Sequence, residues 1–274
     1  MTVPPSEEID TPLDPLTVSA VAVTAYLIAN VLHEGIGHAG ACLLTGCHPR
    51  MLTTAYFDGD KTGVSEGAVR FIAAAGTLVN LAAGALFFRR LRQSRSASGS
   101  VRYFLWCSMA INLLVGAGYP LFSGVLGIGD WITVIGGLKP AGLWRLGLAI
   151  AGIVLYGAAA RFCLRELGRL TGSGDRLGVE RAVQLTVRPY LIGSTAATLG
   201  ALLNPLGMRF VATSAAAHFG GTSALAWIAQ RLDTPGFPPA EGQPIQIRRS
   251  AGWVTIAAML LALHVAVLGR GIRF

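Results

Sequence analysis

The chain has little charge for its length. Only 13% of its 274 residues are Asp, Glu, Lys or Arg, against about 25% in an average soluble domain. By contrast, 53% are hydrophobic and the mean hydropathy is +0.56. A water-facing globule of this size needs more charge to solvate its surface. The composition argues against a soluble enzyme, a disordered chain and a secreted disulfide scaffold, and it predicts a multi-pass membrane protein.

Lysine is almost absent, although the chain is basic. The net charge of +8 comes from 22 Lys and Arg residues against 14 Asp and Glu residues, and Lys61 and Lys139 are the only lysines. The arginines stand at the ends of apolar stretches, where membrane proteins place charge to face lipid headgroups and to fix their orientation. We therefore expect the lipid bilayer as a partner, and no nucleic acid.

Cysteine is scarce and forms no CxxC pair. Of Cys42, Cys47, Cys107 and Cys163, three lie in or beside apolar runs, where a free cysteine behaves as a small buried hydrophobe. We expect no redox role for any of them.

The apolar stretches predict an all-α, polytopic helical bundle with six or seven transmembrane spans. A helix needs about 20 apolar residues to cross the hydrocarbon core, and the stretches that meet this length are 16–46, 68–88, 102–123, 142–164, 187–206, 209–230 and 251–269. The fifth and sixth are separated by Asn204-Pro205, so they are either two spans or one broken span.

The parts between the spans complete the predicted organisation. Residues 1–15 form a polar tail, and the proline-rich segment 231–249 is an exposed loop. The segment 124–138 is apolar but glycine-rich and too short to cross, so it is expected to be re-entrant or interfacial. A cytoplasmic N-terminus places most of the basic residues inside.

Two carboxylates, Glu34 and Asp130, stand inside apolar surroundings. An ionisable group in a span costs about 2.5 kcal/mol or more and is normally retained because it faces a cavity, a partner or an ion. The first span has three such groups within six residues, because His33 and His38 accompany Glu34 in VLHEGIGHAGACLLTG.

Two imidazoles and a carboxylate on one helix are the parts of a hydrolytic zinc site. The imidazoles bind Zn²⁺, and the Glu takes a proton from the bound water. In the usual HExxH motif the histidines are four residues apart and about 40° apart around the helix, whereas a spacing of five gives about 140°. A π-bulge would restore the register, and Gly35 and Gly37 would ease it. The alternative is that these groups are polar glue between helices.

The first half of the chain resembles the site-2 protease family of membrane-embedded zinc metallopeptidases (peptidase family M50-like). HEGIGHAGACLLTG is similar to the first motif of that family with one residue inserted, so that HExxxH stands in place of HExxH. AAAGTLVNLAAG has the spacing from Gly76 to Asn80 of the second-span pattern. NLLVGAGYPLFSGVLGIGD resembles the segment whose final aspartate, here Asp130, completes the zinc site.

The resemblance implies a metallopeptidase core over 16–141, with additional spans over 142–274. Asp130 is then the third zinc ligand; the residues alone also point to it, since a catalytic zinc keeps three protein ligands. The alternatives are that Asp130 caps a short helix starting at Trp131, or that His218 or His264 supplies the third ligand. His48 is expected to be solvated.

Asn80 and Asn112 are amides in predicted spans. They are candidates for substrate binding, where they would position an extended backbone or stabilise an oxyanion. Hydrogen bonding between helices is the alternative for both.

The expected function is a zinc-dependent peptidase of a prokaryotic plasma membrane that cleaves membrane-associated polypeptides. Zn²⁺ on His33, His38 and Asp130 would activate water, with Glu34 as the proton acceptor. One alternative is a transporter or proton-coupled carrier that uses the His-Glu-His cluster as a relay. Another is a haem-binding membrane protein with histidine ligands on facing helices.

Overall fold

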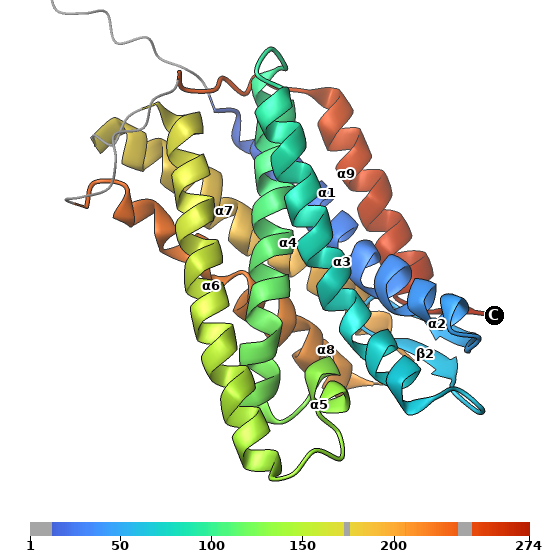
Figure 1. Ribbon diagram of the computed structural model, residues 1–274. Coiled ribbons are helices and arrows are strands. Elements are labelled where there is room, and N and C mark those ends of the chain that lie inside the picture. Colours follow the sequence, from blue (N-terminus) through green and yellow to red (C-terminus); the bar gives the residue numbers. More distant parts are fainter. Residues whose placement is uncertain (1–12, 173–175, 206, 235–242) are drawn as a thin grey trace, which may run out of the picture.

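The structure is a computed structural model that describes residues 13–172, 176–205, 207–234 and 243–274. Most of these residues are helical, and the long helices lie side by side as a bundle (Figure 1). Most of the predicted tail 1–15, and residues 235–242 of the predicted loop, lie outside the described residues.

Among the described residues, five helical segments are long and apolar enough to cross a membrane: Pro15–Leu44, Glu66–Gln93, Gly99–Leu126, Ala141–Thr171 and Ala251–Leu268. The first consists of α1 (Pro15–Val31), a π-helical stretch η1 (Leu32–Ala39) and α2 (Gly40–Leu44). The next three are α3, α4 and α6, and the last is α9 (Ala251–Leu263) with the π-turn η6 (His264–Leu268). The membrane-protein class predicted by the composition agrees with these helices.

Local sequence explains where the helices begin and end. The Asp14 side chain accepts a hydrogen bond from the Thr17 N–H, and Pro15 occupies the first turn of α1. Ser65 caps α3 in the same way through the Ala68 N–H. Gly127 ends α4 with φ +71° and Gly172 ends α6 with φ +87°, a conformation that favours glycine.

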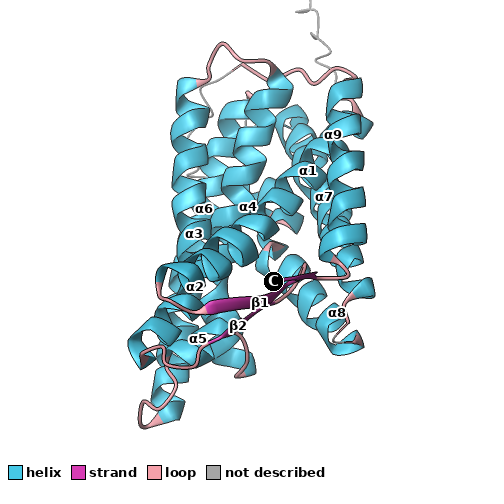
Figure 2. Ribbon diagram, turned by 90° about the vertical axis from the view of Figure 1, so that its right-hand side faces the viewer, coloured by secondary structure: helices cyan, strands magenta, loops and turns pink. Residues whose placement is uncertain are grey.

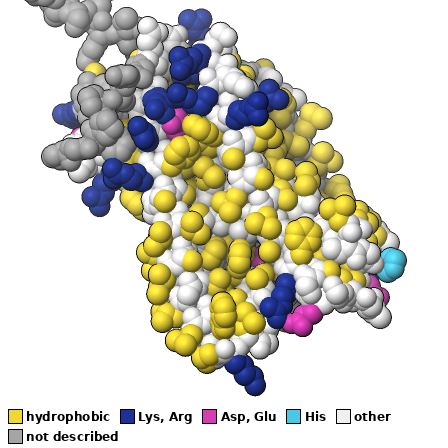
Figure 3. All heavy atoms as spheres, in the orientation of Figure 1, with side chains coloured by type: hydrophobic (Ala, Val, Ile, Leu, Met, Phe, Trp, Pro, Cys, Tyr) yellow, Lys and Arg dark blue, Asp and Glu magenta, His cyan; other side chains and the backbone are white. Residues whose placement is uncertain are grey.

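The centre of the bundle is formed by α1 and α4. Small residues of α1 such as Ala22 and Ala25 are fully buried, together with Trp106 and Met109 of α4. The surface over the middle of the bundle is hydrophobic (Figure 3). On α6 the exposed apolar side chains are Leu143, Trp144, Leu146, Ile150, Ile153, Val154 and Leu155. A face of this kind suits contact with lipid tails.

In the region of the fifth and sixth predicted spans, the helix is interrupted at Asn204-Pro205, as the sequence predicts. Helix α7 (Arg176–Leu199) passes into a 3₁₀ turn, η2 (Gly200–Leu203), and Asn204 is extended. The chain resumes as α8 (Met208–Ala215), a π-turn η3 (Ala216–Gly220) and the 3₁₀ turns η4 (Ser223–Ala226) and η5 (Ile228–Arg231). The sixth predicted span is thus a series of short helical pieces.

A small antiparallel sheet is the main departure from the all-α prediction. Its order is β2-β1-β3, from β2 (Phe57–Asp60), β1 (His48–Leu52) and β3 (Ile272–Arg273). It lies at one end of the bundle, beside α2 and α5 (Asp130–Val134) (Figure 2). Strands of two to five residues are too short for an alternating pattern to reveal them.

The opposite end of the bundle carries many of the arginines (Figure 3). The chain start and the C-terminal loop meet there, because Arg249 pairs with Asp14 at 2.9 Å and the Ile245 N–H donates to the Leu170 carbonyl. The α3–α4 connection belongs to the same end, since Gly99 lies directly against the backbone of Gln246. With the predicted cytoplasmic N-terminus, these segments would lie inside together with most of the basic residues.

Candidate metal centre

The π-helix η1 brings His33 and His38 to one face. The Gly40 N–H donates to the Gly35 carbonyl, five residues earlier, as in a π-helix. Residues five apart then lie one above the other, and the two imidazole centroids are 4.8 Å apart in an edge-to-face arrangement. The bulge that the HExxxH spacing predicts is therefore present.

Each imidazole is held through its Nδ1 atom. His33 Nδ1 lies 2.6 Å from Asn80 Oδ1, and His38 Nδ1 lies 2.7 Å from the Ile72 carbonyl oxygen. Both partners are acceptors, so each Nδ1 carries the proton and donates. In the neutral tautomer this leaves the Nε2 lone pair of both rings for a ligand, the arrangement that metal-binding histidines use.

Asp130 reaches the same point from another element. It is the first residue of α5, after Gly129 with φ +87°. The N-cap residue is thus Gly129 and not Asp130, which favours the ligand interpretation over the helix-cap alternative. Trp131 Nε1 donates to Thr77 Oγ1 at 3.1 Å, which fixes α5 on α3. Just after α5, the Gly136 carbonyl accepts a second hydrogen bond from α3, donated by Arg70.

The three side chains converge on a common point. Asp130 Oδ2 lies 3.4 Å from His33 Nε2 and 3.2 Å from His38 Nε2, and all three atoms are within 4.8 Å of one another. Ligand atoms about 2.0–2.2 Å from a tetrahedral zinc are about 3.3–3.5 Å apart. The His33, His38 and Asp130 group is therefore one that could hold a metal ion.

The chemistry of this group also fits a cation. Asp130 Oδ2 is buried and has no hydrogen-bond partner among the described residues, and the two facing Nε2 atoms are lone-pair donors. Acceptors gathered in a buried site repel unless a cation or protons lie between them. Two imidazoles and one carboxylate make a donor set that zinc accepts, and they leave a fourth position open.

Two glycines allow the rings to lie against α3. A Cβ on Gly76 would be 2.6 Å from His33 Nε2 and from His38 Nε2, so only glycine fits there. A Cβ on Gly37 would be 2.6 Å from the Gly76 Cα. The backbones of η1 and α3 are therefore in direct contact beside the His33, His38 and Asp130 group.

Glu34 lies beside this group, at a pocket. The pocket has about 70 Å³ open to water-sized molecules and is lined by side chains of α1, η1, α4, α8 and η3, including Asn30, His33, Glu34, Tyr119 and His218. The Glu34 side chain makes no hydrogen bond or ion pair with another described residue. A carboxylate next to the first histidine and open to water is placed to exchange a proton with water.

Asn80 and Asn112 are fully buried and bonded to each other. Asn80 Nδ2 donates to Asn112 Oδ1 at 2.8 Å, and Asn112 Nδ2 donates to the Ser108 carbonyl. Neither residue lines the pocket. This position favours hydrogen bonding between helices over the predicted substrate binding, and for Asn80 it adds the orientation of His33.

The other histidines lie apart from the group. His218 lines the pocket, where its Nδ1 is 2.8 Å from the Ser214 carbonyl and its Nε2 is 3.3 Å from Asn30 Nδ2. His264 is buried against the Ala197 carbonyl. Neither rival third ligand joins His33 and His38, and His48 is exposed as predicted.

Two contacts at the candidate metal centre were not predicted from the sequence. Tyr119 stacks on the His33 ring with centroids 5.3 Å apart. The bond from Trp131 to Thr77 is the other. Tyr119 stands next to Pro120 in a predicted span, and an aromatic in an apolar span gives no signal that separates ring stacking from ordinary packing.

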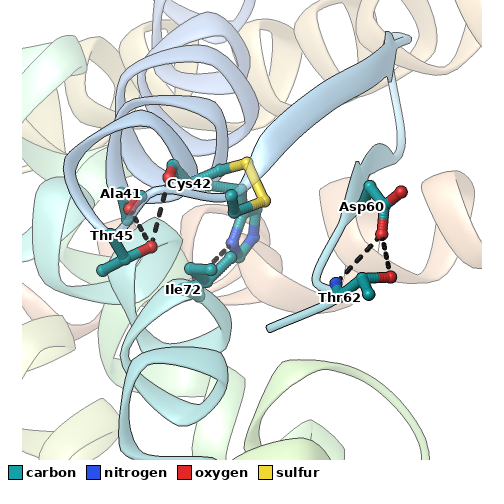
Figure 4. Close-up of a disulfide and its surroundings, with 8 residues drawn as sticks. Ala41, Cys42, Thr45, Asp60, Thr62 and Ile72 are labelled. Carbon is teal, nitrogen blue, oxygen red and sulfur yellow. Dashed lines mark hydrogen bonds between the residues drawn. A yellow bond between two sulfur atoms is a disulfide. The ribbon is translucent and has the colours of Figure 1, made fainter. Parts of the chain in front are cut away.

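A disulfide near the candidate metal centre corrects, for Cys42 and Cys47, the expectation that the cysteines are free, buried hydrophobes. Cys42 of α2 is bonded to Cys47, just before β1 (Figure 4). A Cβ on Gly59 would be 2.7 Å from Cys47 Sγ, so β2 packs against the bridge. On β2, hydrogen bonds from Thr62 and the Arg50 ion pair lower the pKa of Asp60 to about 2. Cys107 and Cys163 are free and buried, as predicted.

Comparisons with known proteins identify no relative. No family model matches the chain. No curated protein and no solved structure matches it either.

Proposed function

We propose that this protein is a membrane-embedded zinc-dependent peptidase. The observation that carries the proposal is the meeting of His33 Nε2, His38 Nε2 and Asp130 Oδ2 at one buried point. The resemblance of three stretches to the site-2 protease family points to the same residues. The proposed reaction is the hydrolysis of peptide bonds in membrane-associated polypeptides.

Each residue has a defined part in the reaction. His33, His38 and Asp130 would hold the metal, and Zn²⁺ bound there would lower the pKa of a water molecule and polarise a carbonyl. Glu34 accepts a proton from the attacking water as its oxygen bonds to the carbonyl carbon. Glu34 then donates that proton to the amine nitrogen as the C–N bond breaks. The products are a carboxylic acid and an amine, and Glu34 returns to its starting state.

Supporting contacts keep these groups in place. Asn80 and the Ile72 carbonyl hold the two imidazoles in the tautomer that presents Nε2. The pocket at Glu34 provides room for water, which hydrolysis consumes. A helical substrate would have to unwind locally to present an extended peptide bond to Glu34.

The test compares metal content and cleavage in three forms of the purified chain. The wild type should hold about one zinc per chain, His33→Ala should lose it, and Glu34→Gln should keep it while losing cleavage of a membrane-anchored test polypeptide. His48→Ala is the matched control, because that exposed histidine lies on β1. Equal zinc content in wild type and His33→Ala would contradict the proposal.

The same measurements separate the peptidase from a proton relay. A relay built on His33, Glu34 and His38 would purify without stoichiometric metal and would keep its activity in the presence of a chelator. A peptidase would lose cleavage on chelation and regain it when Zn²⁺ is added back.

A further inference from the structure

A second polar site lies at the opposite end of the bundle from the candidate metal centre. It is a pocket of about 410 Å³ at the C-terminal ends of α3 and α6 and the N-terminal end of α4. Its lining residues are Leu91, Arg92, Arg95, Arg102, Glu166, Arg169 and Leu170. This volume is within the usual range for small-molecule sites.

The pocket has an excess of positive charge. Four guanidinium groups face a single carboxylate, that of Glu166. The Glu166 side chain is only 4% exposed, pairs with Arg169, and has Arg92 at 3.9 Å. Glu166 lies just beyond the predicted span 142–164, and it is buried nonetheless. Its partners account for two of the four arginines.

Arg95 and Arg102 have no acidic partner within the described part of the chain. The Nε atom of Arg102 is buried and has no hydrogen-bond partner among the residues that the structure describes. An unpaired buried N–H of a charged group is unfavourable. Arg102 also lies near the start of α4, whose first turn contains no acidic residue, and the positive end of a helix dipole disfavours a cation. Both features would be relieved by an anion.

The position of the pocket indicates what kind of anion it meets. It lies where two apolar helices end, at the level at which arginines meet lipid headgroups. The arginine-rich end is seen from the side in Figure 3, where basic side chains gather. Below it, α6 exposes an apolar face that would accommodate acyl chains.

We propose that this pocket binds a phosphate group, held by Arg95 and Arg102 and flanked by Arg92 and Arg169. Guanidinium groups match phosphate oxygens with paired, charge-assisted hydrogen bonds. The phosphate could belong to an anionic phospholipid or to free inorganic phosphate. This site is independent of the proposed peptidase activity.

The experiment uses the full chain in nanodiscs and measures the thermal unfolding midpoint. The first arm compares phosphatidylcholine with phosphatidylcholine containing phosphatidylglycerol, and the second adds inorganic phosphate to phosphatidylcholine discs. A rise in the midpoint in the first arm assigns the site to lipid, and a rise only in the second assigns it to free phosphate. No rise in either arm overturns the proposal.

Matched variants test the residues. The double variant Arg95→Gln/Arg102→Gln should fold, because it removes charges that lack an acidic partner, and it should lose at least tenfold in phosphate or lipid affinity. The control Arg89→Gln/Arg90→Gln removes the same charge from exposed positions of α3 that do not line the pocket. An equal loss in both double variants would show only general attraction to anions and would overturn the assignment.

A third variant, Glu166→Gln, should increase anion binding instead of lowering it. Glu166→Gln removes the carboxylate that competes with the anion for Arg92 and Arg169. Retention of phosphatidylglycerol or phosphate, followed by native mass spectrometry, should therefore increase. Unchanged or decreased retention in a folded Glu166→Gln variant would contradict the proposed site.

Discussion

Asn80 Oδ1 lies 2.6 Å from His33 Nδ1, and this contact determines which nitrogen of the His33 ring faces Asp130. Asn80 is itself oriented by Asn112 and by the Ala29 carbonyl. A chain of amides thus runs from α4 through α3 to the imidazole. Partners of this kind behind a metal ligand set both its tautomer and its orientation.

We predict that Asn80→Ala lowers zinc affinity by about 10- to 100-fold, the usual effect of removing such a partner. Asn112→Ala should have a smaller effect, because it leaves the bond between Asn80 and His33 intact. Competition with a zinc-binding dye measures both values. Wild-type affinity in Asn80→Ala, or a larger loss in Asn112→Ala, would contradict this role.

Gly76→Ala should remove most of the bound zinc. The new Cβ would lie 2.6 Å from the Nε2 atoms of both His33 and His38, so the rings must move. Overpacking of this kind costs about 1–3 kcal/mol of stability, which a thermal melt would detect. Gly67→Ala is the control on the same helix, because a Cβ there has nothing within 4 Å. Retention of zinc by Gly76→Ala would show that both imidazoles can move away from position 76 and still bind the metal.

Trp131→Phe tests how α5 positions Asp130. The substitution keeps an aromatic ring but removes the N–H that donates to Thr77 Oγ1. We expect about tenfold weaker zinc binding, and a similar loss in Thr77→Val. The double variant should lose no more than either single variant, because both remove one bond. Additive losses would mean that the two residues act separately.

The disulfide predicts which end of the bundle faces the cytoplasm. Disulfides persist on the oxidising side of a membrane, so the end with Cys42 and Cys47 should face away from the cytoplasm and the arginine-rich end should face it. Cys42 and Cys47 are themselves buried, so the probe is a cysteine introduced at the exposed Lys61, directly after β2 (Lys61→Cys). In intact cells, an impermeant thiol reagent should label this variant. Ser96 is exposed in the connection between α3 and α4. A cysteine placed there (Ser96→Cys) should be labelled only after the cells are opened. The reverse pattern would invert the orientation.

The sequence allowed the grouping of His33, His38 and Asp130 to be predicted for a physical reason. Burying His33, Glu34 and Asp130 in apolar surroundings is unfavourable, so their presence alone marked a site, and the spacing of five residues required the π-helix. The break at Asn204-Pro205 was similarly predictable, because proline ends a helix.

Other features depend on tertiary contacts that no local pattern encodes. The strands β1 and β3 pair across most of the chain length. Cys42 and Cys47 are joined because the end of α2 turns back toward β1. The requirement for glycine at position 76 arises only when η1 packs against α3.

The direct backbone contact between Gly37 and Gly76 holds η1 against α3 beside Glu34. No side chain lies between these two backbones, so a change of rotamer cannot widen the gap between η1 and α3. The wall opposite is made of α8 and η3, short pieces that contribute Ser214 and His218. Any widening of this pocket would therefore involve α8 and η3, which span only a few turns, and not the contact between η1 and α3.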